Sequence, residues 1–365
     1  MNHKKSLLSI ILLACGLLSF AEVNVGVFLP FKSKGPSAQQ AVEYYRGLLM
    51  AVDSLSNMGT TFKVTAADCG KTATDIQSLL DESKNGVFDI IFAPSNLPQA
   101  EVINKYSILN GTKVVVPFGG RYDELITNPN FYALKVTQTD YTIAAYKLIT
   151  QAFKDKKLYV VSTNGGAQIC PLANYVKNYV KGAKLLEATK KEEKVIQLLT
   201  DKNAIIIPSM YDEDTQKAIM TLVSKVPSVN ATIIGYPNWY ERTLTTTESQ
   251  ALGKANVYLV MQQYPRQGLP RVNKFIHDYQ ANFDTSLPNE RFSIAMWGFD
   301  TGYYMLKAVA RYKREFKNQP LYSAPLQNKF HFEPRNDGQG YINTQVILLH
   351  YKANGTQDII ESTEH

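Results

Sequence analysis

The chain has 365 residues, of which 45% are hydrophobic and 19% are charged. This balance excludes an intrinsically disordered chain and supplies enough apolar material for about two domains. The net charge of +7 is a mild basic excess. Because the sequence has no basic stripe interleaved with aromatic residues, we expect no nucleic-acid partner.

The first 21 residues predict a secretory signal peptide. The basic segment MNHKK precedes an apolar run of fifteen residues, SLLSIILLACGLLSF, which is shorter than the roughly 20 residues of a membrane span. Small residues precede Glu22, so we expect cleavage after Ala21 and export to the periplasm or cell envelope. The segment LLACG resembles a lipobox, and lipidation at Cys15 is therefore the alternative.

The first part of the mature chain alternates between β-rich and helical segments. The expected strands are VNVGVFLP, TFKVTAAD, VFDIIFAP, TKVVVPFGG and FYALKVTQ, and the expected helices are AVEYYRGLLMAVDSL, TDIQSLLDESKNG and QAEVINKYSILNG. VFDIIFAP is apolar on both faces, which is typical of a central parallel strand.

The same alternation restarts in the second part. The expected strands are KLYVVSTNGG, NAIIIPSM, ATIIGYP and ANVYLVMQQY, and the expected helices include DYTIAAYKLITQAF, PLANYVKNYVKG and DEDTQKAIMTLVSKV. Two helical stretches follow, near Arg271 to Phe283 and Arg291 to Phe316, and then a β tail with a turn at Asn354-Gly355. This pattern predicts an α/β protein with two Rossmann-like lobes, each with a parallel-rich sheet and helices on both faces.

Gly47 lies in the middle of the first expected helix, where glycine costs about 1 kcal/mol relative to alanine. Gly47, Ala51 and Ser54 are spaced three or four residues apart and therefore share one side of the helix. We expect these small side chains to let the helix approach a neighbouring element closely.

The expected strand ends supply the candidate ligand-binding residues, because ligands of open α/β sheets bind outside the carboxyl ends of the strands. These segments are rich in hydroxyl, amide, glycine and aromatic residues, which suit a small polar ligand. The candidates are Ser95, Asn96, Phe118, Gly119, Thr163, Asn164, Tyr211, Tyr236, Asn238 and Trp239. Each of them could instead be a turn or helix-cap residue.

Motifs for catalysis, cofactors and metals are absent from the sequence. The segment CGKT at residues 69–72 lacks the first glycine of a phosphate loop, no GxGxxG follows the first strand, and Ser95 is not within a GxSxG motif. The histidines of the body form no HExxH motif. We therefore expect a protein that is not an enzyme, with no catalytic residue, no cofactor and no metal.

Cys69 and Cys170 remain after cleavage of the expected signal peptide. They fall in different halves of the chain, so a disulfide between them would tie the two lobes together. Export permits such a bond, but two free or buried thiols are the preferred interpretation.

The order of several segments resembles the type I periplasmic binding proteins, of which the branched-chain amino-acid receptors are the archetype. The segments are VGVFLPF, EYYRGLLMAVDSL, FDIIFAPSNLPQAEVINKY, GTKVVVPFGG, NPNFYALKVTQTDY and FSIAMWGFDTGYYMLKAVAR. A closer resemblance is to the binding-protein-like domain of bacterial envelope proteins that carry LysM repeats, although this chain has no LysM segment.

The resemblance implies two lobes joined by three crossovers. It places residues 22–138 in lobe 1, 139–264 in lobe 2, 265–327 in lobe 1 as return helices, and 328–365 in lobe 2 as strands and tail. The crossovers are expected near residues 137–140, 263–266 and 327–331. In the receptors, residues at the places of Ser95 and Gly119 bind the ligand carboxylate, whereas Asn238 stands where they often carry an acid.

Two functions follow from these expectations. The first is an exported, monomeric solute-binding protein that holds a small polar ligand in the interlobe cleft and presents it to an ABC permease or a sensor. The alternative is a non-catalytic envelope scaffold, associated with peptidoglycan or its synthesis, whose ligand cleft is degenerate.

Overall fold

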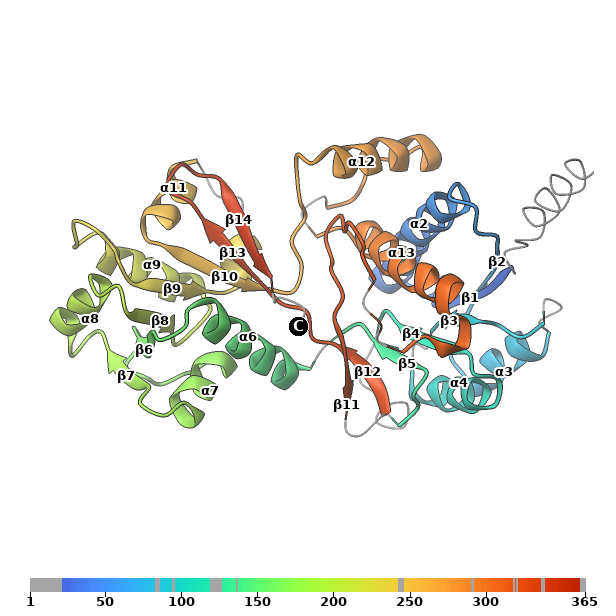
Figure 1. Cartoon of the computed structure of the whole chain (residues 1–365), viewed down its shortest axis with the longest axis horizontal. Coiled ribbons are helices and arrows are strands. Elements are labelled where there is room, and N and C mark those ends of the chain that lie inside the picture. The colour runs from blue at the N-terminus through green and yellow to red at the C-terminus, as the bar shows by residue number, and fades with distance from the viewer. Residues whose placement is uncertain are drawn as a thin grey trace, which may run out of the picture.

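The computed structural model describes residues 22–82, 86–93, 96–118, 127–135, 137–241, 246–289, 292–317, 319, 321–335 and 339–361. The expected signal peptide with Cys15, and the candidates Ser95 and Gly119, lie outside these residues. The described chain forms two α/β lobes that stand side by side and are joined by extended segments (Figure 1). Within it, no helix has both the length and the apolar character needed to cross a membrane.

The first lobe, lobe 1, contains a seven-stranded sheet. Its strands are β1 (Val23–Leu29), β2 (Phe62–Asp68), β3 (Ile90–Phe92), β4 (Lys113–Val116), β5 (Phe131–Ala133), β11 (Phe332–Arg335) and β12 (Gln339–Asn343). They lie in the order β11-β12-β5-β4-β3-β1-β2. Five pairings are parallel and only β11–β12 is antiparallel, because most strands are connected through a helix.

Helices cover both faces of this sheet. They are α2 (Pro36–Ser56), α3 (Ala73–Asp81), α4 (Leu97–Asn110) and α13 (Ile294–Tyr312), whereas α12 (Pro270–Phe283) packs on the outside of α2 and α13. Successive side chains of β1 point to opposite faces, so Val27 packs in the cluster with α2 and α13, whereas Phe28 packs with α3 and α4. The β-rich pattern of the first segment therefore builds two cores at once.

The second lobe, lobe 2, has the same construction. Its strands are β6 (Lys157–Ser162), β7 (Lys184–Glu187), β8 (Ala204–Pro208), β9 (Thr232–Gly235), β10 (Val257–Met261), β13 (Ile347–Tyr351) and β14 (Gln357–Glu361). They lie in the order β14-β13-β10-β9-β8-β6-β7, with the antiparallel β13–β14 hairpin at the edge. Its helices are α6 (Gln138–Ala152), α7 (Pro171–Tyr179), α8 (Glu192–Leu199), α9 (Glu213–Val223), α10 (Asn238–Glu241) and α11 (Thr246–Lys254).

The hairpin turn between β13 and β14 forms where the sequence predicts it. Gly355 adopts a φ of +83°, a conformation that favours glycine, and its N–H donates to the carbonyl oxygen of Lys352. The predicted α/β class, with two parallel-rich sheets, is confirmed.

The chain passes between the lobes three times, and the third passage differs from the expected one. The first joins β5 to α6, and the second joins β10 to α12. The third joins β12 to β13, at residues 344–346 rather than near 327–331. The expectation that all of 328–365 belongs to lobe 2 is wrong for β11 and β12, because β12 pairs in parallel with β5 of lobe 1.

Helices α2 and α13 cross where each of them carries a glycine, Gly47 on α2 and Gly298 on α13. A Cβ atom added to Gly47 would lie 1.8 Å from the carbonyl oxygen of Ala295, and one added to Gly298 would lie 2.0 Å from that of Tyr44. The backbones therefore touch directly, and the close approach predicted for Gly47 is confirmed. This contact fixes the start of α13, which borders the space between the lobes.

Candidate ligand-binding cleft

A cavity of about 680 Å³ lies between the two lobes, beside the connecting segments. Its volume is in the usual range of small-molecule sites. The described lining residues are Gln40, Pro117, Phe118, Leu134, Lys135, Thr137, Gln138, Tyr141, Pro237, Met261, Gln262, Gln263, Phe292, Ser293, Ile294, Trp297, Gln327, Asn328 and Asn343. Both lobes and the first two connections contribute, together with Asn343 at the end of β12, directly before the third connection.

An aromatic group forms the lobe 1 wall. Phe118 follows β4, and Trp297 lies on the first turn of α13; their ring centroids are 5.5 Å apart with the planes at 85°. Tyr44 of α2 packs edge-on against both rings, at 5.2 and 5.8 Å. Since Tyr44 is fully buried while Phe118 and Trp297 are partly exposed, the buried tyrosine supports two rings that face the cavity.

The start of α13 is positioned by its own cap. The Ser293 hydroxyl accepts a hydrogen bond of 3.1 Å from the Met296 N–H, as an N-cap residue does. The Ser293 N–H donates to the Gln327 Oε1 at 2.9 Å. These bonds join the helix to the neighbouring segment that lines the cavity.

A buried carboxylate holds that segment in place. Asp300 of α13 accepts backbone hydrogen bonds from Leu326, Gln327 and Asn328, at 2.8, 2.8 and 2.6 Å. Burial raises the pKa of Asp300 to about 7, although the three N–H donors act in the opposite direction. Asn328 Nδ2 then donates to Gln263 Oε1 at 3.2 Å, which connects the segment to the second passage between the lobes.

The lobe 2 wall is formed by the start of α6 and by the ends of two strands. Thr137 caps α6 by accepting from the Asp140 N–H at 3.1 Å. The Tyr141 hydroxyl donates to the Val260 carbonyl oxygen at 2.9 Å, and burial raises the pKa of Tyr141. The hydroxyl of Tyr141 thus keeps its hydrogen and donates it to a carbonyl oxygen of β10, so the side chain is a neutral part of the wall.

The cavity is rich in amides and poor in charge. The amide side chains are Gln40, Gln138, Gln262, Gln263, Gln327, Asn328 and Asn343. Among the described lining residues, Lys135 is the single charged side chain, and it is exposed. A ligand with polar groups and at most one negative charge therefore matches this lining, whereas an ammonium group would find no carboxylate among the described lining residues.

Metal binding finds no support in the described part of the chain. Nowhere in it do three His, Cys, Asp or Glu side chains gather as a metal site requires. Cys69 and Cys170 are both buried and not bonded to each other, in agreement with the preferred interpretation of two separate thiols.

The structure places one of the ten sequence-predicted residues, Phe118, in the cavity lining. Asn96 caps α4 by accepting from the Gln99 N–H at 3.1 Å. Asn164 closes a turn by accepting from the Ser162 hydroxyl at 2.8 Å, and Thr163 belongs to the same turn. The hydrogen bonds of Asn96 and Asn164 are thus those of a helix cap and a turn, the alternative roles considered for the candidates.

Two of the remaining predicted residues of lobe 2, Tyr211 and Trp239, pack against a third, the buried Tyr236. The Tyr236 hydroxyl donates to the Pro208 carbonyl oxygen at 2.6 Å and lies 3.0 Å from the Cys170 sulfur. Trp239 is 1% exposed and packs against Tyr236. Tyr211 and Asn238 are exposed, and none of these four candidates is a described lining residue of the cavity.

Sequence reasoning missed the contributions of α13 and of the connecting segments. Among the described strands, five (β4, β5, β9, β10 and β12) bring residues at or just beyond their ends to the cavity. Trp297 and Ser293 come from a helix start. A usable signal was Trp297, one of two tryptophans in the chain, on a helix that begins directly after a serine cap.

Comparison with known proteins gives the fold and no close relative. No protein-family model matches the sequence, and no curated protein matches it. A crystal structure from Rhodospirillum rubrum, assigned as a branched-chain amino acid ABC transporter, aligns with a TM-score of 0.58 at 15% identity, over 93% of this chain and all of that one. A similarly assigned structure from Silicibacter pomeroyi aligns with a TM-score of 0.49 at 13% identity, over 94% and 96% of the two chains.

The first of these alignments spans nearly the whole described chain. Together with the two seven-stranded sheets and the three passages, it shows the type I periplasmic binding protein fold. At 15% identity the likeness carries the fold alone.

Proposed function

We propose that this chain is a solute-binding protein whose lobes close on a small polar ligand for transport or sensing. The observation that carries the proposal is the 680 Å³ cavity, lined by both lobes and by the first two of the connections between them. A ligand that touches both walls binds the closed form more tightly than the open form and therefore shifts the hinge equilibrium. Such a mechanism needs binding alone, without a chemical step.

The lining suggests the class of ligand. The faces of Phe118 and Trp297 offer apolar contact, the amides offer donors and acceptors, and Lys135 offers one positive charge. We propose a neutral or singly anionic molecule with an apolar body. A free α-amino acid is disfavoured, since no described lining residue provides a carboxylate for its ammonium group.

Export and partners belong to the same proposal. Residues 1–21 would direct the chain to the periplasm or cell envelope, with lipidation at Cys15 as the alternative, and an ABC permease or a sensor would receive the loaded protein. The LysM-associated resemblance supports the second candidate, an envelope scaffold. That candidate predicts capture of peptidoglycan or a synthase, with no ligand in the cleft.

The test is a thermal-shift and small-angle scattering screen of the mature protein. The panel holds neutral amides, monocarboxylates, free amino acids, short peptides and cell-wall fragments. A ligand at a hundred times its Kd should stabilise the folded state by about 2.7 kcal/mol and lower the radius of gyration. We expect hits among the amides or monocarboxylates and none with leucine.

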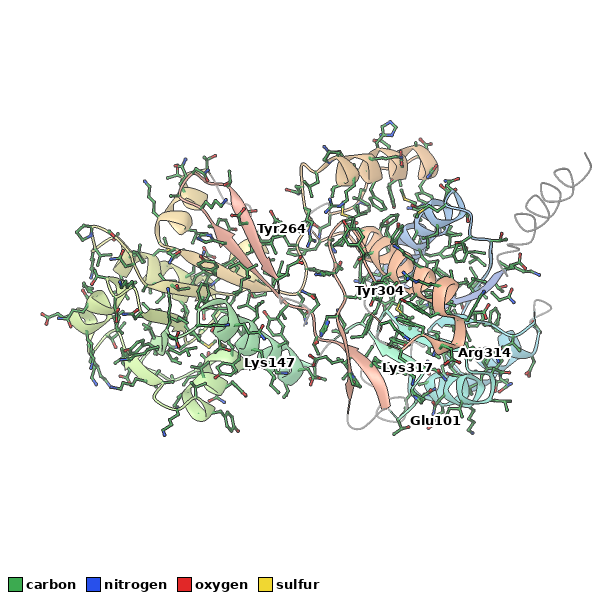
Figure 2. The ribbon with its side chains drawn as sticks, viewed as in Figure 1. Glu101, Lys147, Tyr264, Tyr304, Arg314 and Lys317 are labelled. Carbon is green, nitrogen blue, oxygen red and sulfur yellow. The ribbon has the colours of Figure 1, made fainter. Side chains whose placement is uncertain are left out.

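Two lysine variants localise any hit. Lys135→Ala removes the charge of the cavity lining, whereas Lys147→Ala removes an exposed charge from α6, outside the lining (Figure 2). An anionic ligand should bind Lys135→Ala more weakly and Lys147→Ala unchanged. If no compound changes the melting temperature or the radius of gyration, the solute-binding proposal fails.

A further inference from the structure

A second concave surface lies on lobe 2, between α6 and α7. This groove has a volume of about 350 Å³ and is lined by Gln138, Thr139, Thr142, Ile169, Pro171, Asn174, Tyr175 and Tyr179. It adjoins the interlobe cleft, since Gln138 lines both. Its volume suits a small ligand.

Two tyrosines of the groove lining, Tyr175 and Tyr179, form a row with Tyr146, which lies beside the groove. Tyr175 and Tyr179 are four residues apart on α7 and therefore lie on one face, with ring centroids 5.2 Å apart. Tyr146 of α6 continues the row, 5.3 Å from Tyr175. The row runs outward from the protein, because Tyr146 and Tyr175 are partly buried while Tyr179 is 75% exposed.

The polar atoms of the row are available to a ligand. Within the described part of the chain, no hydrogen-bond partner is found for the hydroxyls of Tyr146, Tyr175 or Tyr179. Asn174 uses its Oδ1 to accept from Asn178 at 3.0 Å, which leaves its amide N–H groups for other partners. Thr139 is exposed and adds a further hydroxyl.

The groove is also neutral. None of its eight described lining residues carries a charge, so it offers nothing specific to a phosphate, a nucleotide or an acidic peptide. Aromatic faces are electron-rich and attract the weakly polarised C–H groups of a sugar ring. The sugar's hydroxyls in turn match amide and hydroxyl side chains. Tilted aromatic rings beside neutral donors and acceptors thus fit a saccharide.

We propose that the groove between α6 and α7 binds a neutral saccharide, with Tyr175 and Tyr179 stacking on sugar rings and Asn174 and Thr139 pairing with sugar hydroxyls. This site lies outside the interlobe cavity and does not require the hinge to close. It gives the protein a means of attaching to a glycan independently of what the cleft holds.

The test uses three neutral tetrasaccharides, tetra-N-acetylchitotetraose, cellotetraose and maltotetraose, as probes of the mature protein. Saturation-transfer NMR detects contact, and isothermal titration calorimetry measures affinity. We expect at least one probe to bind, and Tyr179→Ala to weaken it about tenfold. Because Tyr179 is so exposed, this variant should keep the melting temperature of the unaltered protein.

Two controls separate the groove from other surfaces. Tyr322→Ala removes another highly exposed tyrosine, 84% exposed, from lobe 1 and should leave saccharide binding unchanged. Lys135→Ala alters the interlobe cavity and should also leave it unchanged. The proposal is overturned if none of the three probes binds, if Tyr179→Ala binds as well as the unaltered protein, or if Lys135→Ala abolishes binding, which would place the sugar in the cleft.

Discussion

Replacing Gly47 with alanine tests the packing that positions the cleft wall. The new Cβ would lie 1.8 Å from the Ala295 carbonyl oxygen and 2.8 Å from the Phe299 nitrogen, whereas ordinary contacts begin at 3.4 Å. Helices α2 and α13 would have to separate by more than 1 Å, because both obstacles are backbone atoms. Overpacking of this kind costs about 3 kcal/mol, at the upper end of its usual range.

The gain in helix propensity offsets part of that cost. Alanine is favoured over glycine by about 1 kcal/mol in a helix, so the net loss for Gly47→Ala is about 2 kcal/mol. In a chain of 365 residues each kcal/mol lowers the melting temperature by roughly 1–2 °C, because the entropy of unfolding grows with chain length. Differential scanning calorimetry of the mature protein, with urea unfolding for the free energy, measures both quantities.

Gly302→Ala provides the matched control on the same helix pair. There the new Cβ would meet the Ala51 Cβ at 3.1 Å and the Leu48 Cγ at 3.3 Å, which small shifts relieve. We expect this variant to lose far less stability than Gly47→Ala. A Gly47→Ala protein as stable as the unaltered one, or a Gly302→Ala protein that is equally damaged, would refute the close-contact argument.

Three further predictions concern buried polar groups. Burial raises the pKa of Asp300 to about 7, so protonation of Asp300 stabilises the folded state. This contribution is complete below about pH 4 and is lost as the pH rises through 7. Urea unfolding should therefore give a lower free energy of unfolding at pH 8 than at pH 5.5, a difference that Asp300→Asn lacks. Glu43→Gln should cost about 2 kcal/mol of unfolding free energy, because the buried carboxylate accepts hydrogen bonds from the Tyr279 hydroxyl and from Arg46 Nη1 that are strengthened by its charge, and an equally stable variant would contradict this. Because Cys69 and Cys170 are buried and unbonded, maleimide should label both in denaturant without reductant and neither rapidly in the native state; labelling that requires a reductant would reveal a disulfide.

Local signals in the sequence were sufficient for the architecture. Strand and helix alternation, the apolar strand FDIIFAP and the small residue Gly47 each depend on neighbours within a few positions, and the structure agrees with all three. The Asn354-Gly355 turn is likewise a local signal that the β13–β14 hairpin confirms.

The sequence does not show which strands pair when they lie far apart along the chain. The segment around β11 is a strand as expected, but its neighbour β12 pairs with β5, which lies far earlier in the chain. Nothing local distinguishes an edge strand of lobe 1 from one of lobe 2, so the third passage was placed too early. The lining of the cavity is hard to predict for the same reason. The twist of the sheet determines which strand ends face the cavity, and local sequence does not show it.

The cleft wall illustrates this point. Phe118 was predicted because it follows a strand, and it lines the cavity. Trp297 lines the cavity too, but a helix carries it, and its position depends on the glycine crossing of α2 with α13. Tyr236 also follows a strand, yet its hydroxyl bonds to Pro208 inside lobe 2.

Tryptophan fluorescence tests the central claim most directly, because Trp297 lies in the cleft and the other tryptophan, Trp239, is buried in lobe 2. The mature protein and the Trp297→Phe variant are titrated with fractions of a small-molecule extract. We predict a saturable change in emission for the unaltered protein that disappears in Trp297→Phe. A change that persists at full amplitude in the variant, or no change with any fraction, would contradict a ligand-binding cleft.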